Sequence, residues 1–164
     1  MKAKTILLAA LLIPVSGAQA RDSLGIFESW GAFRDSGTEA RCYAIAEPVR
    51  GGRARGWKPF AAVGTWPRRN VRGQVHFRLS QEVRKDAAVT LGIGDRRFAL
   101  IAGKADAWAA DKRGDATIIA AIRSGTSMSV NAVAASGRPF TDVYALRGAA
   151  TAIDAAALGC AQIR

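Results

Sequence analysis

Residues 39–48, EARCYAIAEP, contain the pattern that decides the fold class of this chain. Small or sulfur-containing side chains alternate with two larger ones, the first set being Cys42, Ala44 and Ala46 and the second Tyr43 and Ile45. A period of two residues places the two sets on opposite sides of an extended backbone. The stretch therefore predicts a β-strand, which Pro48 ends because proline has no N–H to donate to a neighbouring strand.

The same period recurs along the chain between segments rich in glycine, proline or charged residues. Further strands are expected at residues 26–33, 60–66, 74–80, 88–94, 98–102, 105–111, 126–135 and 140–148. Short strands at intervals of about ten residues are typical of antiparallel sandwiches and barrels. The sequence therefore predicts a mainly β fold, built as an antiparallel sandwich or barrel-like domain.

Two segments break this period and predict short helices, at residues 115–124 and 149–158. The first has isoleucines spaced by three and four residues, as on one face of a helix, and they are Ile118, Ile119 and Ile122. We expect Asp115 to cap its first turn and Gly125 to follow its last turn. The second segment is rich in alanine, and we expect Gly159 to end it.

Residues 1–20, MKAKTILLAALLIPVSGAQA, have the organisation of a secretory signal peptide. Two lysines precede an apolar run, and small residues lead to a cleavage site expected between Ala20 and Arg21. The apolar run is shorter than the roughly 20 residues that span a bilayer. Cleavage would lower the formal net charge from +11 to +9, because the segment holds two lysines and no acidic residue. We expect residues 21–164 to form one β-rich domain without a membrane span, in the periplasm or secreted.

Cys42 and Cys160 are the only cysteines, and they lie 118 residues apart. Exported proteins meet an oxidising environment, so an even pair of cysteines favours a structural disulfide. On a chain-entropy basis, closing so long a loop stabilises the fold by roughly 4 to 5 kcal/mol. A reactive thiol pair is the alternative, but the sequence lacks the C-x-x-C spacing that it would need.

We found no sequence motif of a catalytic or cofactor site: G-x-S-x-G, H-E-x-x-H and G-x-x-x-x-G-K-[ST] are absent. The single histidine, His76, lies opposite the apolar side chains Val75 and Phe77 of its strand, so we expect it at the surface. The 13 acidic residues show no spacing that selects a catalytic pair. Two scattered cysteines and one histidine do not predict a metal site. We expect no enzyme activity and no cofactor.

The excess of arginine is the main chemical signal, and it gathers in two loops around the predicted strand 60–66. The candidate binding surface comprises Arg50, Arg53, Arg55, Trp57 and Lys58 in the first loop and Arg68, Arg69 and Arg72 in the second. The loops can lie at opposite ends of the strand or bend together, and their charge can equally serve solubility. In an exported protein, such a surface suits an anionic envelope component or a protein partner rather than nucleic acid.

Four segments together resemble the invasion-associated locus B family of exported Gram-negative bacterial proteins. They are SWGAF (29–33), RCYAIAEP (41–48), AWAADKRGDATIIAAIRSGTSMSV (107–130) and FTDVYALRGAATAID (140–154). Members often carry cysteines soon after the opening tryptophan and near the central helix; this chain has none there, and Cys160 is not a position associated with the family. The resemblance implies a small exported protein, linked in some pathogens to host-cell invasion, and brings no catalytic residues.

These observations predict an exported, non-enzymatic binding or accessory protein of the cell envelope, which presents the basic loops to an anionic envelope component or a protein. The alternative is a periplasmic hydrolase that acts on an envelope polymer. Such an enzyme needs a cleft with two carboxylates, or with a carboxylate near His76.

Overall fold

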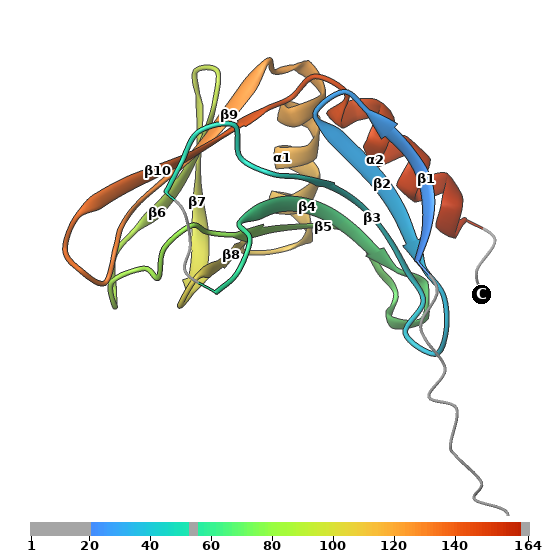
Figure 1. The fold of residues 1–164 in the computed structure, drawn as a ribbon, viewed down its shortest axis with the longest axis horizontal. Helices are drawn as coiled ribbons and strands as arrows, with labels where there is room; N and C mark the ends of the chain where they lie inside the picture. The colour runs from blue at the N-terminus through green and yellow to red at the C-terminus, as the bar shows by residue number, and fades with distance from the viewer. Residues whose placement is uncertain (1–20, 53–55, 162–164) are drawn as a thin grey trace, which may run out of the picture.

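Ten antiparallel strands form one sheet in the computed structural model, which describes residues 21–52 and 56–161 (Figure 1). In spatial order the strands are β1 (Arg21–Phe27), β2 (Trp30–Asp35), β3 (Arg41–Ala46), β4 (Phe60–Trp66), β5 (Val71–Arg78), β8 (Asp106–Trp108), β7 (Arg96–Gly103), β6 (Val89–Ile93), β9 (Ser127–Val133) and β10 (Pro139–Ala145). The predicted mainly β class is confirmed, and these strands do not close into a barrel.

Two strands begin earlier than the sequence indicated. The segment 26–33, predicted as one strand, is instead split between β1 and β2 by a tight turn. That turn carries no glycine, proline or asparagine signal, and Glu28 adopts a left-handed φ of 52° in it. Similarly, β5 begins at Val71, directly after a short 3-10 helix, η1 (Pro67–Arg69), where only a turn was expected.

Both predicted helices are present and both are longer than predicted, α1 spanning Lys112–Ser124 and α2 spanning Ala149–Cys160. Gly125 follows α1 as expected, but Gly159 lies inside α2 rather than ending it. Alanine-rich packing against the sheet continues to Cys160, and this tertiary contact outweighs the modest helix penalty of one glycine.

The predicted cap of α1 is wrong. Asp111, one turn earlier than Asp115, caps the helix by accepting a hydrogen bond from the backbone N–H of Gly114 at 2.7 Å. Asp115 is buried instead, and its carboxylate accepts a hydrogen bond from the Val75 N–H at 2.8 Å. Burial raises the pKa of Asp115, while that hydrogen bond opposes the rise. The contact ties α1 to β5.

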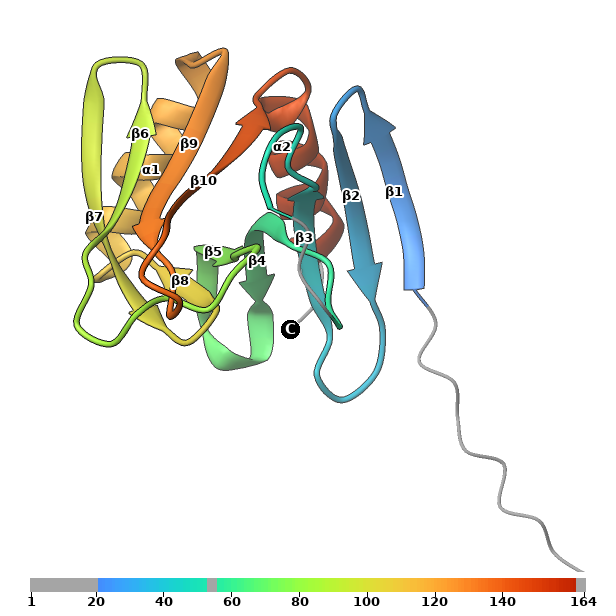
Figure 2. The same ribbon diagram turned by 60° about the vertical axis from the view of Figure 1, so that its left-hand side comes forward.

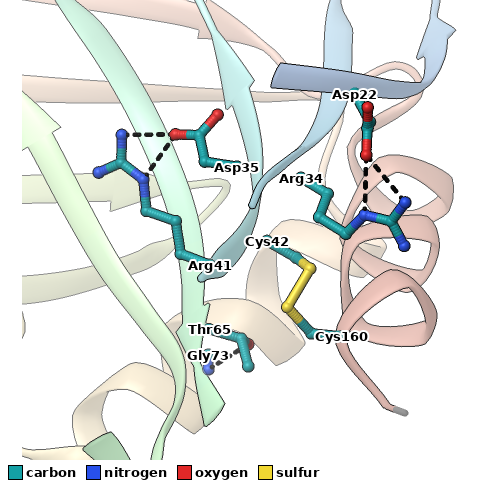
Figure 3. Close-up of a disulfide and its surroundings, with 8 residues drawn as sticks. All are labelled: Asp22, Arg34, Asp35, Arg41, Cys42, Thr65, Gly73 and Cys160. Carbon is teal, nitrogen blue, oxygen red and sulfur yellow. Dashed lines mark hydrogen bonds and ion pairs between the residues drawn. A yellow bond between two sulfur atoms is a disulfide. The ribbon is translucent and has the colours of Figure 1, made fainter. Parts of the chain in front are cut away.

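The helices pack on one face of the strands β1 to β5. α2 contacts β1 to β4, and α1 contacts β5 and α2. The side chains on this face are buried, and they include Cys42, Ala44, Val63, Val75 and Phe77. Cys42 and Ala44 lie on the same side of β3, as the alternation around residue 42 predicted. The predicted disulfide is present, and Figure 3 shows it joining Cys42 of β3 to Cys160 at the end of α2.

The strands β6, β7 and β9 lie on the other side of the molecule from β1 and β2, and β10 runs from them toward α2 (Figure 2). The buried side chains of these four strands include Met128, Val130 and Ala132, and the Tyr144 ring of β10 lies 6.1 Å from that of Phe77. The Trp30 indole N–H donates to the carbonyl of Ala145 at 2.9 Å, which fastens β2 to the end of β10. One core therefore joins both parts of the sheet.

The expected leader, residues 1–20, lies outside the described residues. In the part of the chain that the structure describes, neither helix is long and apolar enough to cross a membrane.

Candidate functional site

The strands β3, β4 and β5 expose a second face, opposite the helices. Strand register places two rows of side chains on it, Tyr43, Gly64 and Gln74 in one and Ile45, Ala62 and His76 in the next. In each row the residue from β4 is small and its neighbours from β3 and β5 are larger. This difference in size forms a trough along β4.

The trough holds a hollow of about 250 Å³, which we call the aromatic hollow. Its rings are Phe33, Tyr43, Phe60, Trp66 and His76, and its other lining residues are Arg21, Arg41, Ile45, Ala62, Gly64 and Gln74. Phe60 and Trp66 are the first and last residues of β4. The Trp66 indole leans over Gly64, where an added Cβ would lie 2.6 Å from the ring, so glycine is required beneath it.

One side of the hollow carries a cluster of charged groups around Asp35. The carboxylate accepts hydrogen bonds from Nε of Arg21 at 3.0 Å and from Nε of Arg41 at 2.9 Å. Both guanidinium groups also lie over the Tyr43 ring, at 5.8 Å for Arg21 and 5.1 Å for Arg41. Two cations share one carboxylate, so this edge of the hollow has a net positive charge.

The environment of this cluster shifts two pKa values in opposite ways. Burial favours the protonated form of Asp35, but the hydrogen bonds and charges of Arg21 and Arg41 outweigh it and lower the pKa. Burial and the nearby charge of Asp35 raise the pKa of Tyr43. At neutral pH the edge therefore holds a carboxylate, a neutral phenol and two guanidinium ions.

His76 lies on the opposite side of the hollow, in contact with other rings. Its imidazole stacks on Trp108, with ring centroids 5.2 Å apart and an interplanar angle of 4°, and the Phe60 ring meets it edge-on at 5.2 Å. Its Nε2 lies 2.9 Å from Oδ1 of Asp106, whose other oxygen pairs with Arg78. His76 is thus held among aromatic and charged partners, and its side chain is only 27% exposed.

The first loop of the predicted basic surface makes several separate contacts. Arg50 forms an isolated β-bridge with Val143. The Trp57 indole N–H donates a hydrogen bond to the Leu79 carbonyl at 2.9 Å, and Lys58 forms an ion pair with Glu47 at 3.5 Å. Arg53 and Arg55 lie outside the described residues. Trp57 also lies beneath the Arg78 guanidinium, at 5.2 Å, which connects this loop to the His76 side of the hollow.

The second loop lies at the other end of β4. A seven-residue strand spans about 20 Å, so the described parts of the two loops do not form one patch. Here Arg68 donates to the Thr38 carbonyl at 3.0 Å, and Arg69 pairs with Glu39. Arg72 lines a separate hollow of about 290 Å³, between β4, β5 and the helices.

Sequence reasoning placed the basic residues but missed the aromatic hollow. The sequence placed Tyr43 on the side of its strand opposite Cys42, and His76 opposite Val75 and Phe77, and both placements are confirmed. The available signal was that these outward positions carry rings, where a solvated strand face usually carries polar side chains. Asp106, the partner of His76, follows it by 30 residues and becomes its neighbour only because β8 pairs with β5.

Among residues 21–52 and 56–161, no three His, Cys, Asp or Glu side chains gather closely enough to hold a metal ion. Comparisons of the chain with protein-family models, curated proteins and solved structures found no significant match. The resemblance to the invasion-associated locus B family therefore stays a prediction from the sequence.

Proposed function

We propose that this chain is an exported, non-enzymatic binding protein of the cell envelope, similar to the invasion-associated locus B family. It holds an anionic envelope component in the aromatic hollow. The observation that carries this proposal is the hollow itself: five rings and a doubly paired carboxylate on the sheet face opposite both helices. A concave, mostly apolar site with a few converging polar groups is the usual form of a ligand pocket.

In this proposal the hollow and the basic loops have different roles. The described loop residues are apart from one another and several are paired with acidic groups or carbonyls. Surface pairs of this kind contribute little specific affinity, although an excess of positive charge speeds the approach of an anion. In this proposal the loops attract the ligand and the hollow selects it.

A capture experiment tests the proposal. Mature protein is immobilised and exposed to solubilised envelope, and the retained material is assayed for phosphate, uronic acid and protein. We expect Phe60→Ala/Trp66→Ala to lose most of the retained anionic material, and Arg50→Gln/Lys58→Gln to lose little at physiological salt. If only Arg50→Gln/Lys58→Gln loses the retained anionic material, the basic loops and not the hollow are the binding surface. If neither the wild type nor any variant retains envelope material, the proposal is overturned.

The second candidate is a hydrolase acting on an envelope polymer, and one observation favours it. His76 and Asp106 lie 2.9 Å apart beside the hollow, in the arrangement of a general base and its orienting carboxylate. Incubation of envelope polymers with the wild type and with His76→Ala, followed by measurement of chain length, tests this candidate. Shortening by the wild type alone would favour the hydrolase, and equal chain lengths would remove it.

A further inference from the structure

We infer that the aromatic hollow takes a segment of a linear acidic polysaccharide, which lies along β4 with a carboxylate against Arg21 and Arg41. This inference rests on the proposed function and names the chemical class of its ligand. It is carried by three features of the hollow: its position on the outer face of the sheet, the rings from the two ends of β4 and the charge on one side.

The position of the hollow on a sheet face suits a segment of a longer chain. The partly exposed Ala62 of β4 forms the open floor, because Gly64 lies beneath the Trp66 indole, and larger side chains of β3 and β5 form the walls. The open part of the hollow lies between Phe60 and the Trp66 indole, which folds back over Gly64. The trough lies on a sheet face, so a ligand segment can rest in it while the rest of the chain continues on either side.

The rings at the two ends suit sugar rings. Phe60 and Trp66 are each only partly buried and line the hollow. The face of an aromatic ring carries partial negative charge, and the axial C–H groups of a pyranose carry partial positive charge, so the two stack. Trp66 is already supported from below by Gly64, which fixes the indole before a ligand arrives. A preformed platform of this kind reduces the entropy lost on binding.

The charge selects an acidic sugar. Arg21 contacts Asp35 through Nε, and Arg41 contacts it through Nε and one terminal nitrogen. A guanidinium has five N–H donors, so each arginine keeps donors for a second carboxylate. Figure 3 shows the other terminal nitrogen of Arg41 pointing away from Asp35. Asp35 thus orients the two arginines without using up their capacity to bind an anion.

The arrangement of the rings disfavours nucleic acid as the ligand. Stacked bases need open ring faces. Here two guanidinium ions cover the Tyr43 ring, and Trp108 covers a face of His76. Of the remaining three rings, Phe33 packs against Tyr43, with ring centroids 5.9 Å apart. Phe60 and Trp66 belong to opposite ends of β4 rather than to adjacent positions.

The test is a titration followed by tryptophan fluorescence and calorimetry, with tetragalacturonate and tetramannuronate as probes. Their methyl esters are matched ligands that keep the rings and lose the charge. We expect at least one acid to bind, and its ester to bind about tenfold more weakly or worse. Arg41→Gln should weaken binding of the acid by a similar factor, and Trp66→Ala should weaken both acid and ester.

Arg138→Gln is the matched control for Arg41→Gln. It removes the same charge from an exposed position between β9 and β10, and we expect unchanged affinity. Equal losses in the two variants, equal binding of acid and ester, or equal competition by a single-stranded oligothymidylate would overturn the inference. If neither acid binds while envelope capture still depends on Phe60 and Trp66, the inference fails and the proposed function stands. If envelope capture also fails, both the inference and the proposed function are wrong.

Discussion

The two faces of β3, β4 and β5 differ in almost every property although they alternate residue by residue. On the helix side, Cys42, Val63 and Phe77 are at most 4% exposed and contact other apolar groups. On the other side, Phe60, Trp66 and His76 are partly exposed and surround a hollow. The helix-side face belongs to the core, and in our proposal the other face binds the ligand, so substitutions on the two faces should affect stability and binding separately.

The disulfide should give the largest effect on the helix side. Replacing both Cys42 and Cys160 by serine removes the closure of a 118-residue loop. We expect a loss of about 4 to 5 kcal/mol in the free energy of unfolding, by the chain-entropy relation. Urea denaturation of the variant and of the oxidised wild type measures this. A loss below about 1 kcal/mol would show that packing of α2 alone holds this face together.

Removing a ring from each face makes the comparison direct. Phe77 is fully buried, so Phe77→Ala should cost about 3 to 5 kcal/mol of unfolding free energy because it leaves a cavity. Phe60 lines the hollow and is partly exposed, so Phe60→Ala should cost about 1 kcal/mol. Both are measured by urea denaturation under the same conditions. Similar costs for the two variants would contradict the assignment of stability to one face.

Two carboxylates should respond to pH in opposite directions. Asp142 is fully buried, with Oδ2 accepting the Ser80 N–H at 2.8 Å and Oδ1 without a partner among the described residues. Burial raises its pKa, so the folded state binds the proton more tightly than the unfolded chain. Stability contributed by this group therefore falls as the pH rises from the unfolded-state pKa through the folded-state pKa.

For Asp35 the sign is reversed, because its folded-state pKa lies below the unfolded value. Its contribution is present above the unfolded-state pKa and is lost as the pH falls through the folded-state pKa. We expect Asp142→Asn to reduce the decline in stability at rising pH and to stabilise the protein at pH 8 by about 1 kcal/mol. Asp35→Asn should instead reduce the decline in acid. Unfolding free energies measured from pH 3 to pH 8 check both, and matching slopes in the two variants would contradict them.

The smallest expected effect is that of Trp66→Ala on stability. The indole is partly exposed and rests on Gly64, so its removal should cost about 1 kcal/mol or less. Thermal unfolding followed by circular dichroism measures this, since the reporter does not depend on the missing tryptophan. A large loss would show that Trp66 is part of the core rather than a platform for a ligand.

The local parts of this fold could be predicted from the sequence, and the contacts between distant strands could not. The alternation around Cys42 identified both faces of β3, and the cysteine pair was confirmed. The β1–β2 turn was missed because Glu28 carries no turn signal. The hollow was missed because its lining residues come from five strands, β1 to β5. Asp106, the partner of His76, reaches it only through the pairing of β8 with β5. Periodicity shows which side a residue faces, but it does not show which residues it will meet there.

The span of the disulfide sets an order of events during biosynthesis. Cys42 lies in β3, between two residues that line the hollow, and Cys160 follows it by 118 residues. The chain between them must be made before the sulfurs can join, and the bond forms only where the surroundings are oxidising. Until then β3 lacks its covalent link to α2. The hollow should therefore reach its final rigidity late in maturation, and a ligand should encounter a finished site only where oxidation has already taken place.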